Sequence, residues 1–400
     1  MNINVHKHIL LVSSYFTSAN TNIMLDIIRI VHPNSIIHLI ASDFFPYQFN
    51  ASDVITYPIS SRRQKFQYVL SRIKKLKFIT RPLNFCIYHI SHILDHFIPN
   101  EYERKSYLLA NQLVQEYPIS EVFTVCYPFY AHNVGYKLSQ NKKINWFTIW
   151  LDSYSNGEAK SNFIWNKVAT HYENKIFNAT KQIYAIRGTF TGNTIIDKFR
   201  QKLSYIGIPY LDDKSVAKLN NDIIYAGSIG GIDRNPHQLM NLLVKSLDFI
   251  PEDLTFKFYV NYPKELQKYE KLSNGRIRVF GYVSIDELDT LLSNSYMLIT
   301  LGNACSFQLS SKIIQSISYR KPILFFYTQE KDISFEYFND YPDLCAINLN
   351  DDINKSIKSL ANYFSKQHSQ IEYIELIRSK RLKECTPDSL KDCFQKSELK

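Results

Sequence analysis

The sequence predicts an α/β protein with two doubly wound parallel sheets that face a cleft. Its 400 residues exceed the ~100–200 of a typical domain. Hydrophobic residues make up 45% and charged residues 21%, enough to bury sizeable cores. Short apolar runs alternate with helix-period segments along nearly the whole chain, a pattern typical of parallel sheets covered on both faces. Two such series indicate two domains.

The first half holds six strand candidates separated in several places by helical patterns. The strands are expected at residues 8–13, 35–40, 53–57, 121–126, 145–151 and 182–186. The helices are expected at residues 20–30, 101–115 and 163–177. The first of the two sheets is therefore expected to lie within residues 1–207.

The second half repeats the alternation. Its strands are expected at residues 223–227, 255–260, 276–281, 296–302, 322–327 and 344–349. A polar stretch at 208–221 is the best break between the two series. We therefore expect one Rossmann-like domain over residues 1–207, a linker at 208–221, a second Rossmann-like domain over 222–375, and a C-terminal helix and tail over 376–400.

Composition narrows the classes of function. No stretch of ~18 apolar residues is free of charge, and no cleavage site follows residues 1–14, so neither a membrane span nor a signal peptide is expected. The six cysteines are scattered, which favours neither a disulfide framework nor a zinc site. The net charge of +10 indicates an anionic partner: nucleic acid, a membrane surface or a phosphorylated substrate.

Glycine is scarce, with eleven residues and none before Gly135, so an N-terminal dinucleotide fingerprint is excluded. A nucleotide should therefore bind in the second half. There, the strand at 223–227 runs into a glycine-bearing turn that contains Arg234, and a helix follows near Pro236. Such a turn can bind an anion at the helix N-terminus. An ordinary turn with glycines for close packing is an equal alternative.

Two further segments indicate a ligand site at the same edge of the second sheet. Residues 278–294 read as a strand, a turn at Gly281 and a helix, with Ser284 and Glu287 forming a capping box. Residues 298–326 read as a strand, a polar loop, a helix beginning near Ser310 and another strand. The carboxyl ends of neighbouring parallel strands meet at one sheet edge, where such folds bind ligands.

Over roughly residues 165–380 the sequence resembles the nucleotide-sugar half of a GT-B glycosyltransferase of the group 1, or family 4, type. These enzymes often carry the segment P-S-K-x-x-E-Y-x-x-x-G-K-P-I, and the aligned stretch here is SSKIIQSISYRKPI, beginning at Ser310. The segment HYENKIFNATKQIYAIR is similar to the family's glutamate-bearing helix. The first 150 residues match only in general pattern.

The resemblance implies a set of donor-binding residues: Gly227, Ser228, Gly230, Gly231, Arg234, Tyr282, Val283, Ser310, Ser311, Lys312 and Gln315. Ser311 and Lys312 would bind the diphosphate, with Arg234 as a second cation. The glycine turn would let the donor come close. The backbone at Tyr282 and Val283 would meet the base, and Gln315 would meet the ribose.

Two positions depart from the family pattern. Gln315 stands where the family has a ribose-binding glutamate, and Phe307 stands at its other acidic position. Glutamine lacks the charge-assisted strength of a carboxylate. Either the sugar is held differently or catalysis has been lost. We expect an active enzyme, because the phosphate-facing residues are retained.

The first domain offers fewer candidates. Asp152 follows a strand, where the family often has an acceptor-facing acid or histidine, and could serve as a general base or an acceptor contact; a capping role is the alternative. His132, also at a strand exit, is expected to be structural. His171 and Glu173 lie on the helix of the family match, and Glu173 could be structural or near the sugar.

Residues 61–94 combine basic and aromatic side chains with no acid. This composition suits an interfacial helix on an anionic membrane, at about 1 kcal/mol per cation near the surface. A solvated basic face of a core helix is the alternative, and nucleic-acid binding ranks last. The residues expected to face the membrane are Arg62, Arg63, Arg72, Lys74, Lys75 and Lys77.

Together these features predict a bacterial, cytoplasmic hexosyltransferase, peripheral on the inner face of the cell membrane. It would move a sugar from a UDP- or GDP-sugar to a lipid-linked saccharide in capsule or exopolysaccharide synthesis. No Asp-x-Asp metal motif occurs in a plausible site, so no obligatory metal is expected. No cofactor is expected either, since the nucleotide-sugar is a substrate. A non-catalytic GT-B subunit that binds an acceptor or a partner transferase is the main alternative. A sugar-nucleotide epimerase and a nucleic-acid binder are the others.

Overall fold

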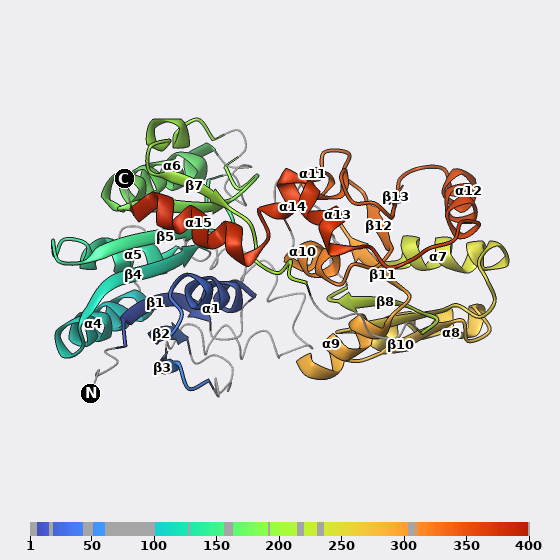
Figure 1. The fold of residues 1–400 in the computed structure, drawn as a ribbon, viewed down its shortest axis with the longest axis horizontal. Helices are drawn as coiled ribbons and strands as arrows, with labels where there is room; N and C mark the ends of the chain where they lie inside the picture. Colours follow the sequence, from blue (N-terminus) through green and yellow to red (C-terminus); the bar gives the residue numbers. More distant parts are fainter. Residues whose placement is uncertain are drawn as a thin grey trace. The chain divides into compact units, whose positions relative to one another are not determined.

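The computed structural model divides the chain into two compact units, shown in Figure 1. The first domain is Met1–Gly207 together with Leu390–Lys400, and the second domain is Ile208–Ser389. The structure describes residues 6–15, 19–42, 51–60, 101–126, 129–155, 163–190, 193–213, 220–229, 236–302, 309 and 311–398.

The first domain is built on a seven-stranded parallel sheet with strand order β3-β2-β1-β4-β5-β6-β7. The order reverses direction between β1 and β4, as in a doubly wound fold. The strands are β1 (His8–Tyr15), β2 (Ile36–Ser42), β3 (Val54–Ile59), β4 (Ile119–Cys126), β5 (Asn145–Trp150), β6 (Gln182–Ile186) and β7 (Leu203–Ile206).

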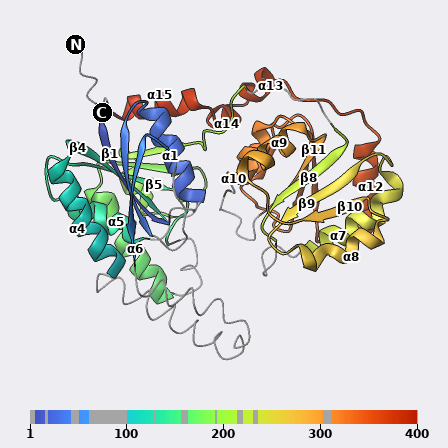
Figure 2. The same cartoon turned by 90° about the horizontal axis from the view of Figure 1, so that it is seen from below.

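Helices cover both faces of this sheet. Figure 2 shows α4, α5 and α6 on one face and α1 and α15 on the other. A large apolar cluster that includes Trp146 and Trp150 fills the interface with α5 and α6. The described helices are α1 (Ala19–Val31), α4 (Glu101–Glu116), α5 (Tyr130–Leu138), α6 (Phe163–Ala179), the short 3-10 helix η3 (Ile196–Phe199) and α15 (Pro387–Glu398).

The second domain is built on a six-stranded parallel sheet with strand order β10-β9-β8-β11-β12-β13. Its order reverses between β8 and β11, so it repeats the topology of the first sheet. The strands are β8 (Asp222–Gly227), β9 (Thr255–Val260), β10 (Ile277–Phe280), β11 (Met297–Leu301), β12 (Ile323–Tyr327) and β13 (Leu344–Asn348).

The two faces of the second sheet are covered unequally. The larger apolar cluster joins the sheet to α7, α8 and α12, and a smaller one joins it to α9. Ser284 caps α9 by accepting a hydrogen bond from the Glu287 amide at 3.2 Å. The helices are α7 (Pro236–Ser246), η4 (Leu247–Phe249), α8 (Pro263–Leu272), α9 (Ile285–Asn294), α10 (Ser311–Ser318), α11 (Phe335–Phe338), α12 (Ile353–Phe364), α13 (Tyr373–Arg378) and α14 (Lys380–Lys383).

The predicted fold class is confirmed, with the expected strands present in both sheets. Four features differ from the sequence analysis. The helix α5 and the short strand β7 were not expected, and the stretch predicted as a linker at 208–221 groups with the second domain. The segment predicted as a C-terminal helix and tail groups with the first domain from Leu390 onward, where the Phe394 ring of α15 stacks on Tyr184 of β6 at 3.9 Å.

Among the described residues, no helix is long and apolar enough to cross a membrane. The same part of the chain brings together no cluster of three or more His, Cys, Asp or Glu side chains that could hold a metal ion.

Candidate functional site

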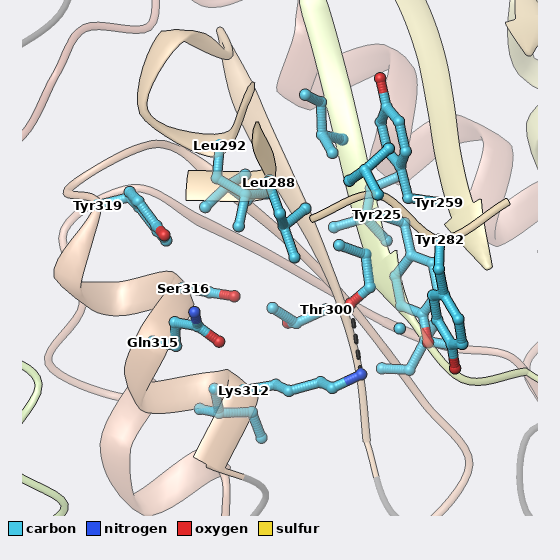
Figure 3. A pocket seen from close by; sticks show the side chains of 18 residues that line it. Tyr225, Tyr259, Tyr282, Leu288, Leu292, Thr300, Lys312, Gln315, Ser316 and Tyr319 are labelled. Atoms are coloured by element: carbon cyan, nitrogen blue, oxygen red, sulfur yellow. Dashed lines mark hydrogen bonds between the residues drawn. The ribbon is translucent and has the colours of Figure 1, made fainter. Parts of the chain in front are cut away.

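A pocket opens at the carboxyl end of β8 in the second domain, on the sheet face that α9 and α10 cover (Figure 3). It encloses about 140 Å³. The sheet order reverses between β8 and β11, and both strands line the pocket. Doubly wound folds bind their ligands at such a switch point. The lining side chains labelled in Figure 3 are Tyr225, Tyr259, Tyr282, Leu288, Leu292, Thr300, Lys312, Gln315, Ser316 and Tyr319.

The Lys312 ammonium lies against the carboxyl end of β8. Its Nζ donates to the Ala226 carbonyl at 3.5 Å, the dashed line in Figure 3. A Cβ atom at Gly227 would lie 2.5 Å from this Nζ and 2.8 Å from the Tyr225 hydroxyl. Any other residue at position 227 would therefore displace one of the two side chains. The glycine lets a cation sit at the mouth of the turn, where an anion could be received.

Hydrogen bonds hold the first residues of the turn that follows β8. The Tyr225 hydroxyl donates to the Ser228 carbonyl at 3.0 Å, and the Ile229 amide donates to Asn261 Oδ1 at 2.8 Å. The hydroxyls of Ser228 and Tyr282 lie 3.2 Å apart. The Tyr282 side chain thus stands at the rim, tied to the turn although 69% of it is exposed.

The interior of the pocket is mostly apolar. Ile224 and Leu298 come from the sheet, and Leu292 comes from α9. Thr300 is the polar exception, because this buried residue has a hydroxyl that finds no hydrogen-bond partner among the described residues. An unpaired buried hydroxyl costs about 1–3 kcal/mol, so its presence needs an explanation.

Opposite the apolar wall, α10 contributes polar side chains. Gln315 and Ser316 face the pocket on the helix turn that follows Lys312 (Figure 3). The Tyr319 hydroxyl donates to Asp289 Oδ1 at 2.6 Å. Burial, and next this carboxylate, raise the pKa of the Tyr319 phenol, so it stays protonated and keeps the wall in place.

The structure gathers several of the predicted donor-binding residues at this pocket. Gly227, Tyr282, Val283, Lys312 and Gln315 line it. The Ser228 hydroxyl contacts the hydroxyl of Tyr282, which lines the pocket, and Ser311 is the first residue of α10. The other predicted residues lie outside the described part of the chain: Gly230, Gly231, Arg234, Phe307 and Ser310 in the second domain, and Arg62, Arg63, Arg72, Lys74, Lys75 and Lys77 in the first.

Sequence reasoning missed Tyr225 and Thr300. A signal for Thr300 existed, because Leu298 and Thr300 alternate on β11 and must share a sheet face. Periodicity does not tell which face is hollowed, so the pattern alone could not distinguish a pocket hydroxyl from a core hydroxyl.

A buried carboxylate, Asp332, lies beyond β12 at the same edge of the sheet. A Cβ atom at Gly302 would lie 2.6 Å from its Oδ2, so glycine again permits a close approach. Its Oδ1 accepts from both the amide and the hydroxyl of Ser334. The sequence analysis did not single out this residue, because nothing in its spacing links it to β11.

The segment after α10 contains a further departure from the family pattern. Arg320 stands at the family's glycine and has a left-handed backbone with φ of 56°. Its guanidinium pairs with Asp213 at 3.0 Å, and its carbonyl accepts from the Ile371 amide. The neighbouring Lys321 is 1% exposed, and burial, aided by the Arg320 charge, lowers its pKa to about 8.

In the first domain, the buried Glu173 of α6 organises the loop that follows β5. Its Oε1 accepts from the Ser153 hydroxyl and from the amides of Tyr154 and Ser155, at 2.9–3.1 Å. Its Oε2 accepts from the Ser155 hydroxyl at 2.6 Å and from the side-chain Nδ2 of Asn193 at 2.9 Å. Burial raises the pKa of this carboxyl, while the donated hydrogen bonds oppose the shift. Glu173 therefore holds the loop in place.

Asp152 immediately precedes that loop. It lies near Cys126 at the end of β4, since its charge adds to burial in raising the pKa of the Cys126 thiol. This position is at the carboxyl edge of the first sheet, where the sequence analysis expected it. Its role toward an acceptor stays a prediction.

The two histidines near this edge differ in exposure. His132 is fully buried on α5, with Nδ1 2.7 Å from the Thr124 hydroxyl and its ring against Trp150. Burial lowers its pKa to about 3, so it is neutral at physiological pH. His171 is exposed on α6. His132 thus occupies a core position.

Solved structures share this fold over nearly the whole chain. TarM matches with a TM-score of 0.60 at 9% identity, covering 99% of each chain. A trehalose-6-phosphate structure from E. coli bound with UDP-2-fluoro glucose matches at 0.57 and 6% identity, covering 98% of each. Sucrose-phosphate synthase from Thermosynechococcus elongatus matches at 0.56 and 10% identity, covering 98% of this chain and 97% of that one.

These solved structures have the GT-B fold of glycosyltransferases, and the protein has the same fold, as the resemblance predicted. At 6–10% identity the likeness establishes the fold alone. No protein-family model and no curated protein matches the sequence.

Proposed function

We propose that the protein is a glycosyltransferase that moves a sugar from a UDP- or GDP-sugar to a lipid-linked saccharide. The observation that carries this proposal is the Lys312 ammonium at the carboxyl end of β8, beside a glycine that no larger residue could replace without displacement. A departing nucleoside diphosphate accumulates negative charge, and a fixed cation at that point stabilises it. The GT-B fold supports this assignment.

In the proposed reaction the bond between the anomeric carbon and the diphosphate oxygen breaks, and a bond to an acceptor hydroxyl oxygen forms. Lys312 and Arg234 neutralise the leaving diphosphate, so no metal is required. Asp152 takes the acceptor proton. Catalysis comes mainly from positioning and from the charge on the phosphate-facing residues.

The binding step is tested by thermal stabilisation of the full chain with UDP, GDP and ADP. A ligand at 100 times its Kd adds ~2.7 kcal/mol to the stability of the domain that binds it. We expect one diphosphate to stabilise the wild type and the stabilisation to disappear in Lys312→Ala. Lys355→Ala is the matched control, because Lys355 is an exposed lysine on α12 that pairs with Asp351. Stabilisation that survives in Lys312→Ala would refute the assignment of this lysine.

The proposed acceptor and location rest on the basic and aromatic composition of residues 61–94. A bacterial capsule or exopolysaccharide enzyme acts on lipid-linked saccharides at the inner face of the membrane, where a basic segment would bind anionic lipids. We expect binding to vesicles containing phosphatidylglycerol, weakened by salt, and no binding to pure phosphatidylcholine vesicles. Reversing the charge of Lys74, Lys75 and Lys77 should abolish it. Equal binding to both vesicle types would refute the electrostatic mechanism.

A non-catalytic GT-B subunit is the second candidate, favoured by Gln315 and Phe307 at the family's acidic positions. The two candidates differ in turnover. An enzyme should release free diphosphate from its sugar donor in the presence of membrane extract as acceptor. A subunit should bind the nucleotide-sugar with no release, and Gln315→Glu should then restore none of it.

A further inference from the structure

We infer that the hydrogen-bonded network at the end of β5 holds Asp152 in position for its reaction, with Glu173 and Thr189 as positioning residues. The inference rests on the proposed function, in which Asp152 takes the acceptor proton. It adds two side chains that act through Asp152 rather than on the substrate. Two observations carry it: the burial of the segment around Asp152, and the side chains that bind its backbone on both sides.

Asp152 is a partly exposed residue within a buried segment. Leu151 before it and Ser153, Tyr154 and Ser155 after it are all buried. Asp152 itself is partly exposed. The segment follows β5 at the carboxyl edge of the first sheet, where doubly wound folds bind their ligands. The fold therefore presents a carboxylate at this edge from a stretch of chain that is otherwise withdrawn from solvent.

Thr189 binds the backbone on the upstream side of Asp152. It lies in the loop after β6, the strand next to β5 in the sheet. Its hydroxyl donates to the carbonyls of Trp150 at 3.4 Å and Leu151 at 3.2 Å. Thr189 is buried, so water does not compete for these carbonyls. The last two residues before Asp152 are thus tied to the neighbouring loop.

Glu173 and Asn166, both on α6, bind the backbone on the downstream side. Glu173 Oε1 accepts from the amides of Tyr154 and Ser155 at 2.9 and 3.0 Å. The Asn166 side chain donates to the Ser155 carbonyl at 3.0 Å. Because the carboxylate accepts from two successive amides, it fixes the orientation of both peptide units. Asp152 therefore lies between two short stretches of backbone that are each held by side chains.

Asn193 in turn fixes the carboxylate of Glu173. Its Nδ2 donates to Glu173 Oε2 at 2.9 Å and to the Ser155 hydroxyl at 3.1 Å. Its Oδ1 accepts from the Ile195 amide at 3.0 Å, so both ends of the side-chain amide are used. A reacting group is held within about 0.5 Å of its productive position only when residues behind it are themselves fixed. The network supplies that support for Asp152.

The test is turnover of the full-length protein, measured as diphosphate released from UDP-glucose, UDP-N-acetylglucosamine or GDP-mannose with membrane extract as acceptor. Thr189→Val removes the hydroxyl at similar size and should lower kcat about tenfold. The KM for the donor should not change, because the donor pocket lies in the second domain. Thr189→Ser keeps the hydroxyl and should retain most of the rate. Glu173→Gln retains one of two accepting oxygens and should also lower kcat.

Thr180→Val is the matched control. The buried Thr180 precedes β6, and its hydroxyl donates to the Trp146 carbonyl at 3.0 Å, at the opposite end of β5 from Asp152. The substitution removes the same kind of hydrogen bond and should lower the urea midpoint as much as Thr189→Val does, with little change in kcat. Equal losses of kcat in the two variants would show that the rate follows the stability of the domain, and would overturn the positioning role.

Asp152→Asn shows whether Thr189 acts through Asp152. If it does, Thr189→Val should cause no further loss of kcat in the Asp152→Asn background, so the two losses do not add. Additive losses would overturn the inference.

Hydrogen exchange gives a readout that needs no turnover. The backbone amides of residues 151–155 should exchange faster in Thr189→Val and Glu173→Gln than in the wild type and Thr180→Val. Unchanged exchange in the first two variants would also overturn the inference.

The outcomes separate this inference from the proposed function. Turnover that Asp152→Asn leaves unchanged would refute the role of Asp152, and with it the positioning role, while leaving the transferase assignment intact. A wild type that releases no diphosphate would refute the transferase itself, and the positioning role would fail with it.

Discussion

The Glu173 loop of the first domain and the pocket of the second lie at equivalent edges of two similar sheets. Glu173 and Thr300, the buried polar side chains at these two places, differ in their hydrogen bonding. Both Glu173 oxygens accept hydrogen bonds, five in all, from side chains and backbone amides of the chain itself. In the pocket, the buried Thr300 hydroxyl has no partner among the described residues, and Tyr282 is mostly exposed.

This difference separates a hydrogen-bonded structural network from a pocket with mostly apolar walls. A fully satisfied buried carboxylate fixes a loop, and a ligand would have to break hydrogen bonds to reach it. The pocket of the second domain instead has apolar walls and a cation, Lys312, beside the end of β8. Glu173, for which the sequence left a structural and a sugar-contacting role open, is therefore a loop-holding residue in this structure.

The largest effect is expected from Glu173→Ala. The substitution leaves Ser153, Ser155 and Asn193 donors buried without an acceptor, at ~1–3 kcal/mol for each unsatisfied group. We expect the first domain to lose several kcal/mol of stability, seen as an earlier transition in urea unfolding. Glu173→Gln keeps one acceptor oxygen and should lose less. Diphosphate binding by the second domain should be unchanged, and its loss would break the contrast between the regions.

The next largest effect is expected from acidification, which should also destabilise the first domain. The His8 and His38 rings are joined by a 2.8 Å hydrogen bond between Nδ1 and Nε2. Burial, and next the charge of His8, lower the pKa of His38 to about 4. Burial also lowers the pKa of His8. Both rings are therefore held neutral in the folded state.

These lowered pKa values fix the direction in which the stability of the first domain changes with pH. A pKa lowered in the folded state means that the unfolded chain binds protons first, so stability is full above about pH 6.5 and falls as the pH drops toward 4. We expect a loss of about 1–3 kcal/mol at pH 4, measured by urea unfolding at fixed ionic strength. His38→Gln should reduce this dependence, and buried His132, whose pKa is lowered to about 3, should account for part of what remains. An identical slope in that variant would show that the pair is not responsible.

Gly227→Ala tests the pocket of the second domain, where it should change ligand binding more than stability. The added Cβ would meet the Lys312 ammonium at 2.5 Å, and the flexible end of the lysine can move away. We expect diphosphate binding to weaken about tenfold, or about 1.4 kcal/mol, with a smaller change in stability. Calorimetry and thermal unfolding on the same sample separate the two. Unaltered binding would mean that the position of the ammonium is unimportant.

The smallest effect is expected from Tyr282→Phe. It removes a hydroxyl that pairs with Ser228 at a solvent-exposed rim, so the change in affinity should stay below about 1 kcal/mol. Tyr282→Ala removes the ring as well and should weaken UDP and GDP binding equally. A loss confined to one nucleotide would give Tyr282 a part in selecting the base.

The sequence predicted most elements of both sheets, because their strands are continuous apolar runs whose burial dominates local preferences. It missed β7, whose residues are mostly only partly buried, and α5, a helix of nine residues that contains Gly135. It predicted a C-terminal helix and tail but missed that this segment belongs to the first domain, because no local pattern shows that Phe394 stacks on a tyrosine of β6.

At the pocket, the resemblance in sequence identified Lys312, Gly227 and Gln315, and they do come together. The rest depended on packing. Glu173 accepts from residues 18 to 20 positions away in either direction along the chain, and no spacing rule predicts such partners. Thr300 and Tyr225 could be assigned to the pocket only from the structure, because the packing of the sheet against α9 and α10 decides which residues line it.

The sequence by itself determined the two doubly wound domains and the position of a basic residue beyond β11, because hydrophobic periodicity and short motifs are local properties of the chain. Only the tertiary structure decided which buried polar groups are satisfied and which lack a partner among the described residues. That distinction depends on atoms brought together from distant parts of the chain, and a hydrogen bond is made or lost over a few tenths of an ångström.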